Sequence, residues 1–229
     1  MKRYFVLALG IMLLAGQVYA QEVTLKTQKD KVSYSIGMDI GMTLKNQSID
    51  VDPAILARGI RDSLTGQKPL MAEQEISETI TTFRKEMTAK QQEAMKQVAE
   101  KNKKEGEAFL AENKKKDGVK TLPSGLQYKV IKAGKGKKPK ATDTVTVDYR
   151  GTLIDGTEFD SSYNRGTPAT FAVNGVIPGW TEALQLMEEG AKWQLFVPSN
   201  LAYGERGAGG QIGPNATLIF EVQLISIQE

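Results

Sequence analysis

The spacing of apolar residues changes at Asp117-Gly118, and this change divides the chain into two parts with different architectures. Between residues 31 and 116, apolar residues recur about every four positions, as on one face of an α-helix. After Gly118, apolar and polar residues alternate as they do in half-buried strands, with Gly-containing turns between the strands. The sequence therefore predicts an α+β protein. An all-α N-terminal arm with a long connecting helix precedes an antiparallel sheet wrapped over a short helix.

The composition excludes several kinds of catalytic site. The 229 residues include no cysteine and no histidine. Disulfides, thiol catalysis, Ser-His-Asp catalysis, the usual zinc sites and a histidine pH switch are therefore excluded. The net charge is +3, of which Lys2 and Arg3 supply two charges, so no general nucleic-acid-binding surface is indicated. We expect no cofactor and no metal.

Residues 1–20 have the pattern of a cleaved secretory signal. Two basic residues precede an apolar run from Tyr4 to Gly16, and Val18-Tyr19-Ala20 has small residues at the positions that a signal peptidase reads. A membrane anchor is the alternative, but roughly 15 apolar residues are short for a span of about 20. We expect a mature protein that starts at Gln21, lies in the periplasm of a bacterium with two membranes, and has no stable membrane anchor. Association with the outer membrane stays open.

Residues 21–70 form the predicted helical N-terminal domain. In its first helix, a face of small residues (Ser33, Gly37 and Gly41) lies beside the apolar face. Each glycine costs a helix about 1 kcal/mol, so close packing against a partner helix is a reason to have them. Packing inside one chain is the alternative. A second helix is expected from Asp52-Pro53 to Gly66, and we predict a homodimer through residues 30–66.

Residues 71–118 are predicted to form the long connecting helix, from about Ala72 to Lys116. Its apolar stripe fades beyond Val98 and returns only briefly at Phe109 and Leu110, and a helix that is polar all round generally stands in water. We therefore expect the later part of this helix to be solvated, with Gly106 as its weakest point. A charged, partly frayed linker is the alternative.

Residues 119–229 form the third predicted domain. Asp155-Gly156 is expected to be a hairpin turn, and a short helix is expected from Gly179 to Glu189, with Leu184 and Met187 facing inward. Strands are expected at residues 193–197 and 217–227, the latter with Leu218, Phe220, Val222 and Leu224 on one face. Aromatic and apolar residues gather on both sides of Val176-Ile177-Pro178-Gly179-Trp180, which predicts an apolar cavity with polar groups at its rim. The Gly-containing segments 132–140 and 204–210 lack the context of phosphate or dinucleotide motifs and are interpreted as loops.

Five segments occur in an order that resembles the FKBP family of peptidyl-prolyl isomerases. They are Val147-Asp148-Tyr149-Arg150-Gly151, Gly156-Thr157-Glu158-Phe159-Asp160-Ser161-Ser162, Val176-Ile177-Pro178-Gly179-Trp180, Ala202-Tyr203-Gly204 and Ala216-Thr217-Leu218-Ile219-Phe220. The segment Asp30-Lys31-Val32-Ser33-Tyr34-Ser35-Ile36-Gly37 and the domain order are similar to the Mip and FkpA type of that family, which is exported and dimeric.

The resemblance implies ten site residues. The catalytic group comprises Tyr149, Phe159, Asp160, Ile177, Trp180, Tyr203 and Phe220, and the substrate-binding group comprises Arg165, Val176 and Ile212. In the family, Trp180 would form the floor under a proline ring. The Tyr203 hydroxyl and the Ile177 N–H would donate to substrate carbonyls, and Tyr149, Asp160 and Arg165 would form a polar set at one wall.

The implied function is peptidyl-prolyl cis-trans isomerisation that assists the folding of exported proteins. The partners would be unfolded or proline-containing polypeptides, with chaperone activity contributed by the helical arm and no nucleic acid involved. A non-catalytic chaperone module that binds client proteins is the alternative.

Overall fold

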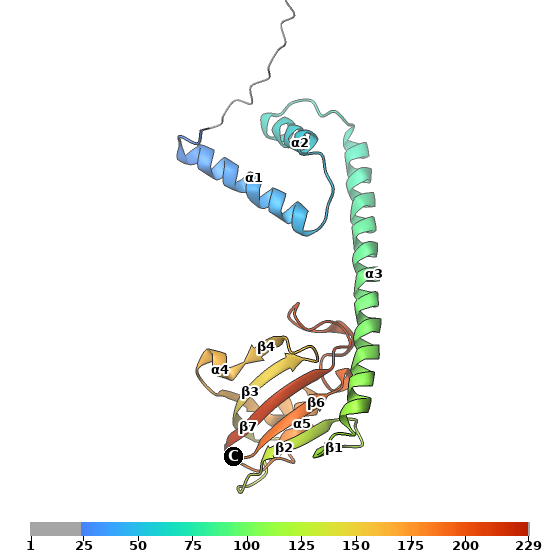
Figure 1. Cartoon of the computed structure of the whole chain (residues 1–229). Helices are drawn as coiled ribbons and strands as arrows, with labels where there is room; N and C mark the ends of the chain where they lie inside the picture. The colour runs from blue at the N-terminus through green and yellow to red at the C-terminus, as the bar shows by residue number, and fades with distance from the viewer. Residues whose placement is uncertain (1–23, 229) are drawn as a thin grey trace, which may run out of the picture. The chain divides into compact units, whose positions relative to one another are not determined.

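The computed structural model describes residues 24–228, and these form two compact units, one through Glu75 and the other from Ile76 onward (Figure 1). The predicted signal segment, residues 1–20, lies outside the described residues. Within residues 24–228 there is no helix that is both long enough and apolar enough to cross a bilayer.

The first unit contains the two short helices that the sequence predicts, α1 (Gln28–Asn46) and α2 (Pro53–Thr65). Thr27 and Asp30 form a capping box at the start of α1, with N–H to side-chain oxygen distances of 2.8 and 3.1 Å. Asp52 caps α2 by accepting from two backbone N–H groups, and Gly66 ends it with φ of 65°. Local capping chemistry therefore sets where both helices begin and where α2 ends.

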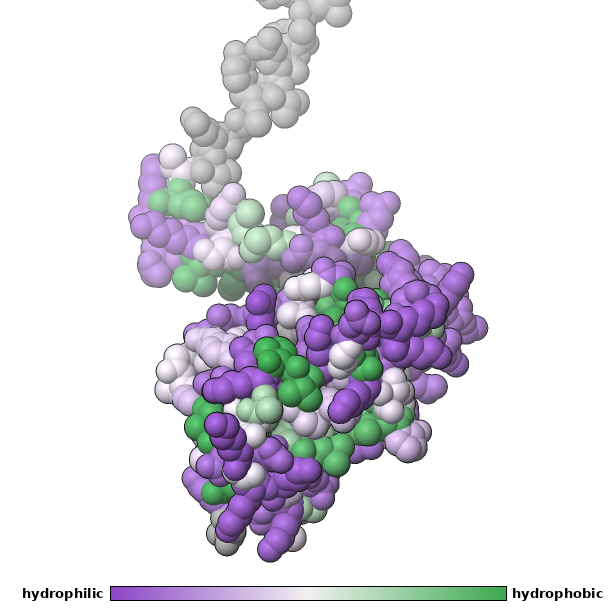
Figure 2. Space-filling view, turned by 60° about the horizontal axis from the view of Figure 1, so that its bottom comes forward, coloured by the Kyte–Doolittle hydropathy of each residue, from purple (hydrophilic) through white to green (hydrophobic). Residues whose placement is uncertain are grey.

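Neither α1 nor α2 buries an apolar side chain. The one buried residue in them is Asp62, which pairs with the Arg58 guanidinium at 2.8 Å. Ile36 is 57% exposed and Ile55 is 70% exposed. Apolar groups are visible on the surface of the helical segment that follows the grey trace (Figure 2). The apolar faces of these helices are therefore uncovered within a single chain.

The long helix α3 (Glu73–Asn113) belongs to the second unit from Ile76 onward, and one face of its last turns packs against the sheet while the other stays exposed. Asn113 is 1% exposed, and the rings of Phe109 and Phe196 lie 6.0 Å apart. Gly106, predicted to be the weakest point, is buried, and a Cβ there would lie 2.3 Å from Oγ1 of Thr217. The prediction of a solvated helix is therefore wrong for this face, which Phe109, hydrogen bonds and a close backbone approach at Gly106 hold against the sheet.

Seven strands form one antiparallel sheet in the order β1-β2-β6-β7-β3-β4, with β5 also paired to β3. Their bounds are β1 (Val119–Thr121), β2 (Gln127–Lys132), β3 (Thr144–Leu153), β4 (Glu158–Ser161), β5 (Ala169–Ala172), β6 (Lys192–Val197) and β7 (Leu218–Gln228). The two longest strands, β3 and β7, pair along ten registered positions. The predicted Asp155-Gly156 turn joins β3 to β4, with the Gly156 N–H donating to the Leu153 carbonyl at 3.0 Å.

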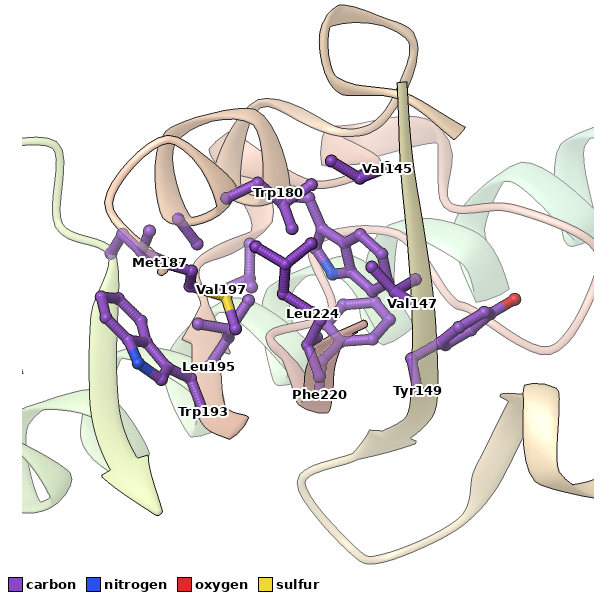
Figure 3. Close-up of a cluster of buried hydrophobic side chains, with 14 of the residues drawn as sticks. Val145, Val147, Tyr149, Trp180, Met187, Trp193, Leu195, Val197, Phe220 and Leu224 are labelled. Atoms are coloured by element: carbon purple, nitrogen blue, oxygen red, sulfur yellow. The ribbon is translucent and has the colours of Figure 1, made fainter. Parts of the chain in front are cut away.

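The core lies between the sheet and α5 (Pro178–Leu184) (Figure 3). This helix is shorter than the predicted Gly179–Glu189, because a tight turn follows it in which the Met187 N–H donates to the Ala183 carbonyl at 3.0 Å. Leu184 and Met187 nevertheless face inward as predicted, and both are fully buried. The remaining short elements are α4 (Ser162–Arg165), η1 (Val173–Gly175), η2 (Ser199–Leu201) and η3 (Gly204–Arg206).

Candidate functional site

A cavity of about 740 Å³ opens between α5, β3, β4 and the loop that precedes β7. Its lining consists of Tyr149, Phe159, Asp160, Phe171, Gly175, Val176, Ile177, Trp180, Tyr203, Ala208, Gly209, Gln211, Ile212 and Phe220. Nine of the ten residues predicted from the sequence are in this lining. The tenth, Arg165, lies outside the lining but contacts Tyr149 and Asp160. The fold therefore brings together side chains from positions 149 to 220.

Trp180 forms the centre of an aromatic cluster at the base of this cavity (Figure 3). Its ring stands nearly perpendicular to three others, with centroid distances of 5.2 Å to Tyr149, 5.9 Å to Phe171 and 5.2 Å to Phe220. Edge-to-face contacts of this kind hold aromatic rings in fixed orientations. The indole N–H is buried and has no hydrogen-bond partner among the described residues. The floor of the cavity is therefore apolar and rigid.

The wall formed by Phe159 and Phe220 depends on a glycine in β3. Their rings are 5.6 Å apart at an interplanar angle of 86°. A Cβ at Gly151 would lie 2.6 Å from two carbons of the Phe159 ring and 2.9 Å from the Phe220 ring. The β3–β4 register shifts between Gly151 and Thr152, a local irregularity that re-aims side chains. Gly151 therefore leaves the space in which the two rings meet.

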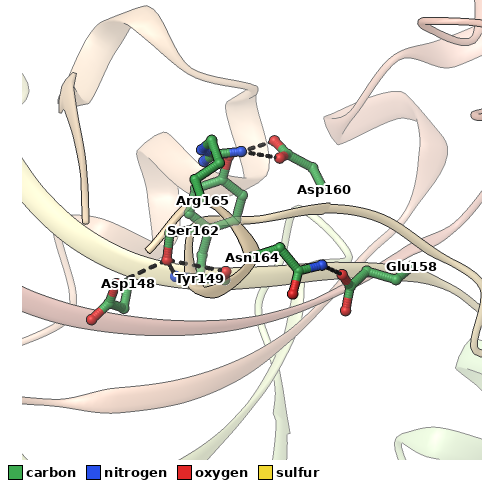
Figure 4. A network of polar contacts seen from close by, with 7 residues as sticks. All are labelled: Asp148, Tyr149, Glu158, Asp160, Ser162, Asn164 and Arg165. Atoms are coloured by element: carbon green, nitrogen blue, oxygen red, sulfur yellow. Dashed lines mark hydrogen bonds and ion pairs between the residues drawn. The ribbon is translucent and has the colours of Figure 1, made fainter. Parts of the chain in front are cut away.

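A polar network that includes the lining residues Tyr149 and Asp160 stands at the cavity wall (Figure 4). The Tyr149 hydroxyl donates to one carboxylate oxygen of Asp160, and the Arg165 guanidinium pairs with the other. The second guanidinium nitrogen of Arg165 donates to the Tyr149 hydroxyl at 2.8 Å. Each of the three groups therefore holds the other two, and the Asp160 carboxylate is kept at the cavity wall.

The network changes the ionisation of its members. Burial, followed by the hydrogen bond to Asp160, raises the pKa of the Tyr149 hydroxyl. Burial alone would raise the pKa of Asp160, but the hydrogen bonds from Tyr149 and Arg165 outweigh it and hold that pKa below its ordinary value. At neutral pH the wall therefore carries a neutral phenol, a carboxylate and a guanidinium.

The backbone under Tyr149 is anchored by Ser162, a buried residue of α4 (Figure 4). The Tyr149 N–H donates to the Ser162 hydroxyl at 2.9 Å, and this hydroxyl donates to the Asp148 carboxylate at 2.8 Å. This pair of bonds ties α4 to β3, so that Arg165 at the end of α4 reaches Tyr149.

Five lining residues are absent from the sequence-based site: Phe171, Gly175, Ala208, Gly209 and Gln211. Phe171 is one of the aromatic residues that gather around Val176–Trp180 in the sequence, although the ten site residues leave it out. The residues at 208–211 come from an irregular glycine-rich loop, and no periodicity marks which of its side chains face inward. Within residues 24–228, no cluster of three or more acidic side chains is placed to hold a metal ion.

Comparison with known proteins adds to this geometry. Residues 135–225 match the family described as FKBP-type peptidyl-prolyl cis-trans isomerase, and residues 29–130 match the domain amino terminal to FKBP-type peptidyl-prolyl isomerase. The outer membrane protein MIP of Legionella longbeachae is 51% identical over 221 residues, which are 96% of this chain and 95% of that protein. The chain belongs to the FKBP-type peptidyl-prolyl cis-trans isomerases. Every residue that lines the cavity lies within the matched isomerase domain.

Other relatives of this FKBP-type isomerase are similar in sequence or structure over nearly the whole chain. The peptidyl-prolyl cis-trans isomerase Mip of Coxiella burnetii is 48% identical over 229 residues, and the alignment spans 100% of both chains. The crystal structure of FkpA from Escherichia coli superimposes with a TM-score of 0.70 at 39% identity, covering 90% of this chain and 99% of that one. The predicted FKBP-like fold, with a helical N-terminal region and long helix, is thereby confirmed. As an FKBP-type isomerase, the protein acts on proline-containing polypeptides.

Proposed function

We propose that the aromatic cavity is where isomerisation takes place, and that the ten residues predicted from the sequence act there. The observation that carries this proposal is the apolar floor at Trp180, bounded on one side by the Tyr149–Asp160–Arg165 network. A proline ring would lie over Trp180, against Phe159, Val176, Ile212 and Phe220. The Tyr203 hydroxyl and the Ile177 N–H would donate to the substrate carbonyls on either side.

The chemistry of the prolyl bond fits such a cavity. Amide resonance keeps the bond planar behind a barrier of about 18–20 kcal/mol, and uncatalysed exchange takes tens to hundreds of seconds. The twisted transition state has lost resonance, and its oxygen is less polar than that of the planar amide. An apolar floor therefore favours the twisted form over the planar one, while donors at the rim hold the flanking carbonyls. Preferential binding of the twisted state lowers the barrier without a covalent step.

A protease-coupled assay with an Xaa-Pro peptide tests the site. The purified protein should accelerate exchange, and Trp180→Ala should remove most of that acceleration. Circular dichroism should accompany the assay, because truncating a buried tryptophan costs about 3–5 kcal/mol of stability. Trp180→Phe keeps an aromatic floor and should retain intermediate activity. Wild-type activity in the Trp180→Ala protein, or no acceleration by the wild type, would reject the assignment.

We further propose that the first unit forms a homodimer through residues 30–66. In support, α1 and α2 bury no apolar residue of their own. Among residues 24–228, no atom outside the helix's own neighbouring backbone lies within 4 Å of a Cβ built at Gly37 or Gly41. A second chain would cover these faces, since helices approach closely over small residues. Two cavities on one dimer would then bind a single client with avidity. Light scattering of the purified protein tests this, and a monomer at all concentrations would reject it.

We also propose a chaperone activity of the helical part. Exposed apolar side chains on α3, among them Ile76, Ile80 and Phe83, lie outside the proposed dimer segment and would hold unfolded segments. If this is correct, the Trp180→Ala protein still suppresses aggregation of an unfolded client although it lacks isomerase activity. Loss of both activities in that well-folded variant would place client binding at the cavity instead.

Export to the periplasm is proposed on two grounds. Residues 1–20 have the composition of a cleaved signal, and the Legionella longbeachae relative is named as an outer membrane protein. We propose a mature protein that begins at Gln21 and carries no stable membrane anchor. N-terminal sequencing of the protein from fractionated cells tests this, and an intact Met1 on cytoplasmic protein would contradict it.

A further inference from the structure

One wall of the cavity is a loop with little regular structure of its own. This rim loop, residues 207–215, contributes Ala208, Gly209, Gln211 and Ile212 to the lining. The loop is closed by a single antiparallel bridge, in which the backbone N–H groups of Ala208 and Ile212 donate to each other's carbonyls at 2.9 and 3.0 Å. A segment with so few internal bonds opens easily unless something outside it holds it.

The base of the rim loop is held by α3, more than a hundred residues earlier in the chain. The Asn102 side-chain amide donates to the Pro214 carbonyl at 2.8 Å, and the Asn215 amide lies 3.5 Å from the Ala99 carbonyl. A Cβ built at Gly213 would lie 3.3 Å from Cγ1 of Val98. The loop therefore rests directly on the side of α3, next to which it is drawn in Figure 1.

Three further contacts keep α3 in one position against the sheet. The backbone of Gly106 packs closely against the Thr217 side chain, and the ring centroids of Phe109 and Phe196 are 6.0 Å apart. The Gln127 amide donates to the Leu110 carbonyl at 2.9 Å. A helix displaced by one residue would place a Cβ against Thr217 and break this hydrogen bond. The position of Asn102 relative to the rim loop is therefore set by packing along the last turns of α3.

We propose that α3 positions the rim loop of the cavity, and that Asn102 is a positioning residue for the isomerase reaction. The hydrogen bond to Pro214 holds the end of the loop from which Ile212 enters the cavity wall. Full activity of the isomerase domain then requires the docked end of α3. Because coupling between binding events is reciprocal, a peptide in the cavity also stabilises the docking of α3. The proposal rests on the assignment of the cavity as the isomerase site.

The test replaces Asn102 by Asp, which has nearly the same shape but no N–H to donate, and by Ala. Each variant should lower kcat/KM for an Xaa-Pro peptide about 3- to 10-fold, the effect of one lost hydrogen bond. The loss should appear mainly in KM, because the loop contacts planar and twisted substrate alike. Lys103→Ala, at the neighbouring exposed position of α3, should keep wild-type kinetics.

Hydrogen–deuterium exchange separates positioning from general destabilisation. In Asn102→Asp, amides of residues 207–213 should exchange faster, while those of β3 and β7 keep wild-type rates. Saturating the wild-type protein with a proline peptide should slow exchange at residues 99–106 of α3. Wild-type kcat/KM together with wild-type loop exchange in both Asn102 variants would overturn the proposal. Trp180→Ala run in parallel distinguishes that outcome, because retained activity in Trp180→Ala would instead reject the cavity as the site.

Discussion

Gly151 of β3 faces the ring of Phe159 so closely that a Cβ would lie 2.6 Å from two ring carbons. We predict that Gly151→Ala displaces Phe159 and Phe220 and disturbs the cavity wall. Overpacking of this kind costs about 1–3 kcal/mol of stability, and kcat/KM should fall about tenfold or more. Peptide isomerisation kinetics and urea unfolding measure the two effects.

The same substitution at Gly59 is a matched control for Gly151→Ala. Gly59 lies within α2, and apart from the helix's own backbone no atom of the described residues lies within 4 Å of a Cβ built there. Gly59→Ala should leave isomerase kinetics unchanged and raise helix stability by about 1 kcal/mol or less. Equal losses of activity in both variants would show that the Phe159 contact is not the cause.

The Asp160 carboxylate makes stability depend on pH in the acid range. Its pKa in the folded protein is lowered, since the bonds from Tyr149 and Arg165 outweigh burial. The stabilisation is therefore present above the unfolded pKa of about 3.9 and is lost as pH falls through the lower folded value. The free energy of unfolding, measured with urea between pH 5 and about pH 2.5, should decrease less steeply with falling pH for Asp160→Asn than for wild type.

Tyr149→Phe provides a second point in the same experiment. This variant removes one donor to Asp160 but leaves the ion pair with Arg165. Its free energy of unfolding should therefore fall with pH less steeply than that of wild type and more steeply than that of Asp160→Asn. Parallel curves for all three proteins would mean that Asp160 is not stabilised by these partners.

A buried hydrogen-bond chain fixes the end of α3. The Asn113 amide donates to Gln127 at 3.0 Å, and both side chains are almost fully buried. Asn113→Ala or Gln127→Ala should each cost about 1–3 kcal/mol, because each leaves a buried partner without its hydrogen bond. The double variant should cost less than the sum of the single losses. Thermal unfolding in a double-mutant cycle measures this coupling, and additive losses would contradict it.

Gly41 provides a direct test of dimerisation. A Cβ there meets nothing within 4 Å in the part of the chain that the structure describes, apart from the helix's own backbone, and leucine favours a helix by about 1 kcal/mol over glycine. Gly41→Leu should therefore leave the single chain folded but raise the dimer dissociation constant about tenfold or more if α1 pairs over this face. Sedimentation velocity measures it. Asp39→Leu, on the opposite side of α1, should leave the dimer dissociation constant unchanged. A weaker dimer in Asp39→Leu alone would instead place the interface on that face.

Local chemistry made much of the fold predictable from the sequence. Asp52, Pro53 and Gly66 determined where α2 begins and ends, because capping groups act within one helical turn. Leu218, Phe220 and Val222 alternate along β7 and face the core as predicted, because side chains of a strand point to opposite faces in turn. Nine lining residues were also named, eight of them within motifs of a known family and Ile212 by its position between two of those motifs.

The sequence by itself determined the helices of the N-terminal arm, the strands β6 and β7, and most of the residues that meet around Trp180. Only the tertiary structure decided what the later part of α3 does. Its polar sequence predicted a solvated helix, yet Asn102, Gly106 and Asn113 all contact the isomerase domain. Periodicity records apolar burial, whereas these contacts are single hydrogen bonds and a close backbone approach between residues about 14 to 112 apart. Such contacts leave no repeating pattern in a sequence, so only the folded structure shows which residues make them.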